Sequence, residues 1–412
     1  MKNLFVLIFL AASAFAQTVP PTMFGLNLHP EVVAPRNSIP WPSIPFGAFR
    51  FWGTQTTWSD MNPSDGSYNF AEMDAWFAIA AKNGMTDFLY TFGETPAWVA
   101  SQAANKGCDH YPESCNPPKD VNADGTGADQ YWKNFVAAVV KHANGRIKYW
   151  EVWNEPDIVP SPSGKGEWSG TNAQLVRMAK DAYTIIKANC PTCQVLSPCP
   201  VDAGSGHTIA SWLPGYVKAG GLPYADIIAF HGYIDSSLQQ KPEAETQKVA
   251  AIKAAIGNSP KPIWDTEGNW GMDTGLLNPQ LQAAYLARMY LVQLSLGVQR
   301  FYWWQYGNTQ MGTLTVNTLA LTSSGQAYVQ LNKWLVGNTM TKPCSTTGTV
   351  WSCKLNSAMI VWDAGQTCTA TACGQTQWNY PIGYTMSSTL DRVSSKLNGG
   401  KVTIGAEPIL LK

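Results

Sequence analysis

Short apolar runs alternate along this chain with longer amphipathic segments. Eight of the runs are near-continuously apolar, a pattern typical of parallel strands that are covered on both faces. The predicted strands are Phe24–His29, Phe46–Gly53, Thr86–Phe92, Ile147–Asn154, Gln194–Pro198, Asp226–Tyr233, Pro262–Glu267 and Gln299–Tyr306.

Between these runs, apolar residues recur at helical spacing. The predicted helices are Phe70–Asn83, Asp129–Asn144, Asn172–Asn189, Glu243–Ile256 and Asn278–Leu296. Three of them end at a glycine, which suits the left-handed residue that often follows a helix. Strands alternating with helices predict an α/β fold, a (β/α)8 TIM barrel. A doubly wound sheet is the alternative, but His29-Pro30 is unlike the glycine-rich turn that usually follows its first strand.

The pattern changes after about Gly337. Short strand-like segments with Gly- and Ser-rich turns predict a small all-β, sandwich-like domain packed on the barrel. Such a domain could be a carbohydrate-binding module, but we favour a structural partner for the barrel. The expected division is therefore a catalytic barrel over residues 17–337 and a β domain over residues 338–412.

The first residues, MKNLFVLIFLAASAFAQ, resemble a secretory signal peptide. One Lys precedes an apolar run too short to span a membrane comfortably, and Ala14-Phe15-Ala16 fits a cleavage site. We expect residues 1–16 to be removed and the protein to be secreted or periplasmic. A retained membrane anchor is the less favoured alternative.

Charge and composition narrow the expected partners. The chain has 28 basic and 28 acidic residues and no basic patch, so neither nucleic acid nor a membrane is an expected partner. Its 18 Trp residues favour a groove that stacks on sugar rings, so carbohydrate is the expected partner. We expect a monomer, although an odd number of cysteines leaves a covalent dimer open.

Nine cysteines in an exported chain indicate disulfides rather than a metal site. The local pairs are Cys108–Cys115, Cys344–Cys353 and Cys368–Cys373. Of the remaining three cysteines, we favour a Cys190–Cys193 pair with Cys199 free.

No metal or other cofactor is predicted. The five His residues are scattered and match no metal-binding spacing. Residues 120–125 resemble the first half of a calcium loop, but Tyr131 occupies the position that such a loop gives to Glu. A polar turn before the following helix is the better interpretation.

Two carboxylates stand where chemistry occurs in a TIM barrel, at the C-terminal ends of strands. Glu155 ends the fourth strand and Glu267 the seventh, on opposite sides of the ring. Glycoside hydrolysis needs such a pair, one protonated and one ionised. Arg50 should favour the charged form of Glu267. Glu155 should keep its proton in a less polar setting beside Trp153 and Trp98.

The segment Tyr149-Trp-Glu-Val-Trp-Asn-Glu-Pro156, with Trp264-Asp-Thr-Glu267, resembles clan A of the glycoside hydrolases. Within that clan the chain is most similar to family 39, which includes β-xylosidases and bacterial exopolysaccharide glycosidases. The resemblance covers the barrel from Phe24 to about Trp334.

The resemblance implies roles for individual residues. Glu155 would be the general acid/base and Glu267 the nucleophile, with retention of configuration. The implied substrate contacts and supports are Asn154 at the sugar 2-hydroxyl, Arg50 and Tyr233 on Glu267, His231 lining the sugar site and Trp304 as its floor. From their places at the rim, His29, Trp98 and Trp270 are further candidates, with a structural role for His29 weighed equally.

We therefore expect a secreted retaining glycosidase that cleaves β-linked polysaccharide or oligosaccharide, with endo action favoured. An exo-acting, β-xylosidase-like enzyme, a transglycosylase and a non-catalytic carbohydrate-binding barrel are the alternatives. Side chains alternate faces along a strand, so if Asn154 and Glu155 both face the ligand, the strand must lose its regular geometry there.

Overall fold

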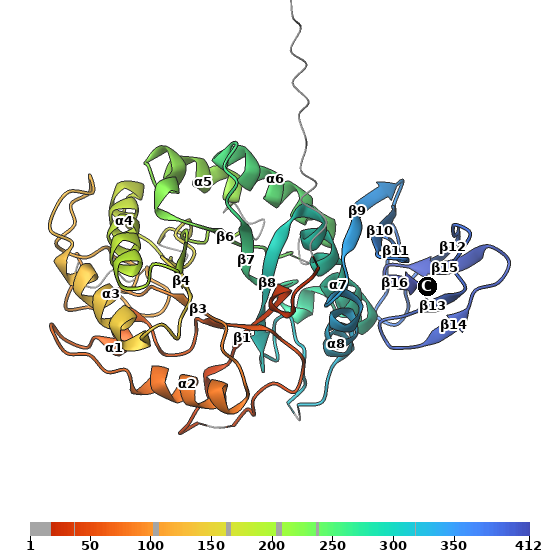
Figure 1. Ribbon diagram of the computed structural model, residues 1–412, viewed down its shortest axis with the longest axis horizontal. Helices are drawn as coiled ribbons and strands as arrows, with labels where there is room; N and C mark the ends of the chain where they lie inside the picture. The colour runs from red at the N-terminus through yellow and green to blue at the C-terminus, as the bar shows by residue number, and fades with distance from the viewer. Residues whose placement is uncertain are drawn as a thin grey trace, which may run out of the picture.

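The computed structural model describes residues 18–36, 38–101, 107–161, 166–202, 208–235, 239–317 and 319–412. The predicted signal peptide, residues 1–16, lies outside the described residues. Figure 1 shows a ring of strands with an outer layer of helices, and a separate group of strands beyond α7 and α8.

Eight parallel strands form the barrel. They are β1 Phe24–Leu28, β2 Ala48–Phe51, β3 Phe88–Thr91, β4 Tyr149–Glu151, β5 Gln194–Leu196, β6 Ile228–His231, β7 Ile263–Gly268 and β8 Val298–Tyr306. Their order is β5-β4-β3-β2-β1-β8-β7-β6. Parallel bridges from Leu196 to Ile227 and from Val201 to His231 bring the two ends of this sheet together. The predicted (β/α)8 barrel is confirmed.

The helices are α1 Trp58–Met61, α2 Ala71–Lys82, α3 Gln130–Ala143, α4 Asn172–Asn189, α5 Ile209–Lys218, α6 Glu245–Ile256, α7 Pro279–Leu296 and α8 Ser323–Leu335. Short 3-10 helices span Pro21–Met23, Pro30–Val32, Leu222–Tyr224, Pro242–Ala244 and Asp273–Gly275. Gly84, Gly145 and Gly297 follow α2, α3 and α7 with positive φ, as predicted. Helix α5 was not predicted, because Pro214 lies inside it and interrupts the helical signal.

The barrel interior has two layers of different chemistry. One is an apolar cluster of Ala48, Leu89, Leu196, Cys199, Ile227, Ala229, Trp264 and Tyr302, in which Cys199 also reaches Arg50. Two positions further along β2 and β4, Arg50 and Glu151 are fully buried and form an ion pair. This spacing follows from the two-residue period of a strand, which returns side chains to the same face. The carboxyl ends of the strands therefore rest on a charged layer rather than on apolar packing.

Antiparallel strands make up the C-terminal region. They are β9 Met340–Thr347, β10 Val350–Leu355, β11 Ala358–Asp363, β12 Gln375–Asn379, β13 Met386–Ser388, β14 Ser394–Lys396, β15 Lys401–Gly405 and β16 Ile409–Leu411. Six of them form one sheet, and β12 pairs with β15. The region contacts the barrel helices: Cys344 N–H donates to Ser295 Oγ at 2.8 Å, and Trp362 Nε1 donates to Glu243 Oε1 at 2.8 Å. The predicted C-terminal all-β region is confirmed.

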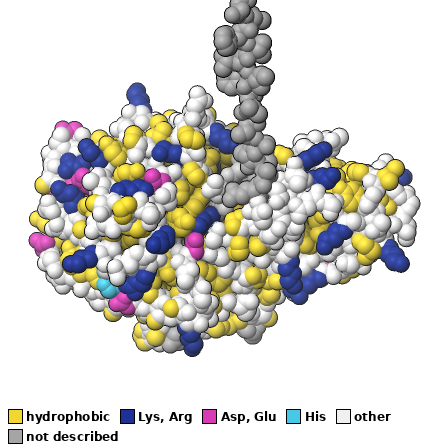
Figure 2. Space-filling view, viewed as in Figure 1, with side chains coloured by type: hydrophobic (Ala, Val, Ile, Leu, Met, Phe, Trp, Pro, Cys, Tyr) yellow, Lys and Arg dark blue, Asp and Glu magenta, His cyan; other side chains and the backbone are white. Residues whose placement is uncertain are grey.

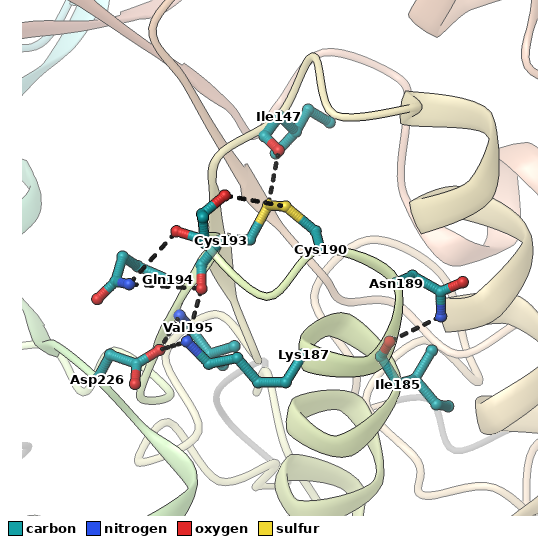
Figure 3. Close-up of a disulfide and its surroundings, with 10 residues drawn as sticks. Ile147, Ile185, Lys187, Asn189, Cys190, Cys193, Gln194, Val195 and Asp226 are labelled. Atoms are coloured by element: carbon teal, nitrogen blue, oxygen red, sulfur yellow. Dashed lines mark hydrogen bonds and ion pairs between the residues drawn. A yellow bond between two sulfur atoms is a disulfide. The ribbon is translucent and has the colours of Figure 1, made fainter.

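Four disulfides join the predicted pairs of cysteines: Cys108–Cys115, Cys190–Cys193, Cys344–Cys353 and Cys368–Cys373. Cys199 is the free, buried cysteine. Figure 3 shows the Cys190–Cys193 bridge between the end of α4 and the start of β5, beside the Lys187–Asp226 ion pair. Four disulfides are typical of proteins from an oxidising compartment.

The surface carries charges of both signs. On the face drawn in Figure 2, Lys and Arg side chains are spread over the barrel and the C-terminal strands rather than gathered in one stripe. None of the helices in the described part of the chain combines the length and hydropathy needed to cross a membrane.

Candidate active site

The end of strand β4 departs from regular strand geometry where the two adjacent polar residues stand. The strand ends at Glu151, and Asn154 makes only an isolated bridge, to Cys199. Glu155 has a left-handed backbone with φ of 41°, and its N–H donates to Cys199 O at 3.0 Å. This turn allows both side chains to face the barrel axis. The predicted break in the strand is present.

Glu267 stands on β7, where the pairing with β6 changes register: Phe230 lies opposite Asp265, and the next residue, His231, lies opposite Glu267. Two donors hold the Glu267 carboxylate. Tyr233 Oη donates to Oε1 at 2.6 Å, and Arg50 Nη1 donates to Oε2 at 2.6 Å. Both contacts were implied by the family resemblance.

The two glutamates face each other across the mouth of the barrel. One carboxylate oxygen of each, together with a ring nitrogen of His231, forms a group whose members all lie within 4.8 Å of one another. The Glu155 side chain is 14% exposed and the Glu267 side chain 7% exposed. Each carboxylate is therefore buried but reachable from the solvent.

Arg50 is the centre of the charged layer beneath the pair. Its guanidinium donates to Glu151 Oε2 from Nε at 3.0 Å and from Nη2 at 2.7 Å. Nη2 also donates to Asn154 Oδ1 at 2.9 Å. Thr91 and Thr266 hydroxyls donate to the two oxygens of Glu151 at 2.7 and 2.6 Å. Glu151 is thus a buried carboxylate whose charge is paired with Arg50.

His231 connects the guanidinium to Glu155. Its Nε2 lies 3.3 Å from Arg50 Nη2, and its Nδ1 lies 2.7 Å from Glu155 Oε1. Arginine has only N–H groups to offer, so the lone-pair nitrogen of a neutral imidazole is the one that faces it. The ring hydrogen is then on Nδ1, which donates to Glu155 Oε1. The other oxygen of Glu155 is left to carry a transferable proton.

The surroundings give the carboxyl groups different proton affinities. Burial and the neighbouring Glu167 raise the pKa of Glu155 to about 8. Burial also raises the pKa of Glu267, against the opposing effect of His231 and Arg50. Burial lowers the pKa of His231 to about 4, so Arg50 is the cation that acts on Glu267 at neutral pH. The site thus pairs a carboxyl that keeps its proton with one that has a cation beside it.

Two predicted sugar contacts have no surface to offer a ligand. His231 is fully buried and bonds Glu155 rather than lining the sugar site. Trp270 is also fully buried; its indole N–H donates to Asp273 Oδ1 at 2.9 Å and its ring packs on Trp303. We therefore do not retain either among the proposed sugar contacts.

The remaining candidates lie at the rim. Trp304 is half-buried, with its ring beside Gly53. His29 is half-buried and caps the 3-10 helix Pro30–Val32 by accepting from Glu31 N–H at 3.3 Å. Trp98 donates to Asn62 O at 2.8 Å and packs on Tyr131, so it is attached to α1 and α3. Sugar contact by these three residues stays a prediction.

Sequence reasoning missed a second group of ionisable side chains beside Glu155. His110 Nε2 lies within 4 Å of carboxylate oxygens of Glu94, Asp109 and Glu167. The signal that could have found it is the position of His110 inside the short loop between Cys108 and Cys115. Glu167 lies on a different loop, so no local pattern joins it to this group.

The charges at the centre of the site disfavour a metal ion there. The group of Glu155, His231 and Glu267 includes the carboxylate that already binds Arg50 at 2.6 Å, and a cation placed among them would be repelled by the guanidinium. At the calcium-like segment, Asp120 accepts from Gln130 N–H at 2.5 Å and Asp124 accepts from Thr126 N–H at 2.9 Å. These are the bonds of a polar turn that leads into α3.

Comparison with known proteins places this geometry in context. The model of glycosyl hydrolase family 10 matches residues 52–166, which include the segment ending in Glu155. No curated protein matched the chain. A family 39 glycoside hydrolase from Bacteroides cellulosilyticus WH2 superposes with a TM-score of 0.65 at 18% identity, over 95% of this chain and 81% of that one.

Two other solved structures are similar in fold. A family 39 β-xylosidase from Caulobacter crescentus gives a TM-score of 0.64 at 15% identity, over 96% of this chain and 97% of that one. The catalytic domain of the family 30 xylanase C from Talaromyces cellulolyticus gives 0.59 at 14% identity, over 96% and 97%. The chain resembles the clan A glycoside hydrolases. The predicted similarity to family 39 is supported, and at these identities the structural likeness is one of fold.

Proposed function

We propose that this protein is a secreted retaining glycoside hydrolase that cleaves β-glycosidic bonds by double displacement. The observation that carries the proposal is the approach of Glu155 and Glu267 from opposite strands, with oxygens within 4.8 Å. Retaining enzymes place the two carboxyl groups about 5–5.5 Å apart, whereas inverting enzymes leave about 6.5–9.5 Å for a water molecule.

In the proposed first step, Glu267 attacks the anomeric carbon while Glu155 protonates the leaving oxygen. Arg50 and Tyr233 hold the carboxylate of Glu267 for attack, and His231 fixes the orientation of Glu155. In the second step Glu155, now ionised, takes a proton from water, which attacks the glycosyl-enzyme and frees Glu267. Asn154 accepts from Arg50 through Oδ1, which leaves its NH2 group for the sugar 2-hydroxyl.

We further propose endo action on a polysaccharide. The partly exposed indole of Trp98 follows β3 and that of Trp304 lies near the end of β8, so two different strands offer stacking surfaces to more than one sugar unit. The structures of similar fold include a β-xylosidase and a xylanase, so β-linked xylans come first among the substrates to test.

The test is hydrolysis of a panel of β-linked glycans with sizing of the products and NMR of the newly released anomer. Glu155→Gln and Glu267→Gln should each reduce kcat by at least about 10³-fold while sugar binding persists, and the first anomer released by the wild type should be β. Asp391→Asn, at an exposed position between β13 and β14 of the C-terminal region, is the matched control. Equal behaviour of the wild type and both site variants would favour a non-catalytic carbohydrate-binding barrel. Release of single sugars from chain ends would refute endo action.

A further inference from the structure

The cluster around His110 is joined through Glu167 to the turn that carries Glu155, and the two-glutamate mechanism leaves the cluster without a role. Three carboxylates surround one ring nitrogen: His110 Nε2 lies 3.3 Å from Glu94 Oε1, 3.6 Å from Glu167 Oε1 and 3.9 Å from Asp109 Oδ2. Tyr111 Oη donates to the other oxygen of Glu94 at 2.8 Å. These contacts hold one imidazole in a fixed position among opposite charges.

Backbone hydrogen bonds attach Glu167 to the turn that carries Glu155. Trp153 Nε1 donates to Glu167 O at 3.0 Å, and Glu167 N–H donates to Ile158 O at 2.8 Å. Ile158 N–H in turn donates to Glu155 O at 3.1 Å. Glu167 is therefore fixed to residues on both sides of Glu155 in the sequence, and its position relative to that residue is set by the fold.

The disulfide loop is joined to the same segment. Gly166 N–H donates to Gly107 O at 2.7 Å, and Asp109 N–H donates to Gly166 O at 3.0 Å. The Cys108–Cys115 bridge closes the loop, and Ser169 N–H donates to Cys115 O at 2.9 Å. The ring of Trp52 meets the His110 ring edge-on at 6.0 Å. Together these contacts place His110, which lies on a separate loop, beside Glu167.

The cluster places charges of opposite sign beside one carboxyl group. Burial alone would lower the pKa of His110, but Glu167, Glu94 and Asp109 raise it to about 9, so the ring is a cation at neutral pH. After burial, Glu167 is the largest influence that raises the pKa of Glu155, and Asp109 adds to it; Arg50 and His110 oppose them. His110 and Glu167 therefore act on Glu155 in opposite directions.

We propose that the Cys108–Cys115 loop belongs to the catalytic apparatus, where His110 and Glu167 are positioning residues whose opposing charges set the pH range in which Glu155 carries its proton. The inference rests on the proposed function, since Glu155 is the general acid there. The ionisable groups that act on Glu155 from the surrounding elements are His231, Glu267, Arg50, Tyr233, Cys199, Asp109, His110 and Glu167.

The experiment measures kcat/KM against pH for the intact, oxidised protein on a glycan that the wild type cleaves. A protonated Glu155 is required, so activity falls as pH rises through its pKa, and this basic limb reports the group. Glu167→Gln removes a negative charge and should move the limb down by about 0.5–1 pH unit. His110→Gln removes a positive charge and should move it up by a similar amount, and His110→Lys should return it toward the wild type.

Two further variants keep the test decisive. Asp109→Asn, whose side chain is 46% exposed, should shift the basic limb in the same direction as Glu167→Gln by a smaller amount, which covers the case in which a more buried variant does not fold. His142→Gln removes a histidine that pairs with Asp74 at 2.8 Å on the helical exterior, and it should leave the profile unchanged.

The inference would be overturned if the basic limb of the kcat/KM profile did not move in these variants. It would also be overturned if His110→Gln and Glu167→Gln moved the limb in the same direction. A loss of activity on dialysis against EDTA that Zn²⁺ restores would overturn it too, because the same four side chains would then be metal ligands. A wild type that cleaves no glycan would instead remove the proposed function, so the two failures are distinguishable.

Discussion

Arg50 offers the sharpest test of the charged layer under the site, through the variant Arg50→Met. The guanidinium makes contacts of 2.6–3.0 Å with Glu267, Glu151 and Asn154 and is fully buried. Methionine fills a similar length of the barrel without charge. Its introduction leaves two buried carboxylates without their cation.

The size of the effect follows from these contacts. Removing one partner of a buried ion pair costs about 3–5 kcal/mol, because the remaining charge stays buried without compensation. Glu151 keeps its two threonine hydroxyl donors and Glu267 keeps Tyr233, so some compensation remains. We expect the free energy of unfolding of Arg50→Met to fall by about 3 kcal/mol.

The double variant Arg50→Met/Glu151→Gln removes the charge from both sides of the pair. It should be more stable than Arg50→Met by about 0.5–3 kcal/mol, the range of interaction energies found for residues in contact. Equilibrium denaturation of the four proteins of this cycle, with disulfides intact, gives the coupling energy.

The same variant should change the pH profile. Burial raises the pKa of Glu267, and without the opposing charge of Arg50 it should rise by about a further 1–3 units. Glu267 must be ionised to attack, so the acid limb of kcat/KM should move to higher pH by that amount. A folded Arg50→Met protein with unchanged stability and an unmoved acid limb would refute the account of this layer.

Other predictions test individual contacts. The pKa of Glu155 near 8 predicts that wild-type kcat/KM is maintained at neutral pH and falls about tenfold per unit above pH 8, measured on any cleaved glycan. Tyr233→Phe removes a 2.6 Å hydrogen bond to a carboxylate, so kcat should fall about 10- to 100-fold with little change in KM; an unchanged kcat would contradict the role of Tyr233 in holding Glu267. Cys199 is fully buried, and burial raises the pKa of its thiol well above the usual range. Iodoacetamide should therefore label no cysteine in the native, unreduced protein and one after unfolding; mass spectrometry showing native labelling would contradict this burial.

The sequence predicted the architecture because the barrel is encoded locally. Near-continuous apolar runs mark strands covered on both faces, and glycines after α2, α3 and α7 mark helix ends. The Trp-Asn-Glu-Pro tetrapeptide could be interpreted for the same reason. The turn that brings Asn154 and Glu155 to one side is formed within these four residues.

What the sequence did not reveal depends on contacts between distant segments. The burial of Trp270 is decided by Trp303 on the next strand, and the partner of His231 is decided by the direction in which Glu155 turns. His110 and Glu167 meet only because two loops run side by side. The residues of one loop do not show which charged side chain the other loop places beside it.

The left-handed backbone at Glu155 has a consequence for the evolution of this protein. A side chain with a Cβ atom in that region costs about 1–2 kcal/mol, a cost that glycine would not incur. Drift toward greater thermal resilience at this position therefore leads directly to loss of the acid. A protein with glycine at this position would therefore be more stable and would lack the proposed acid.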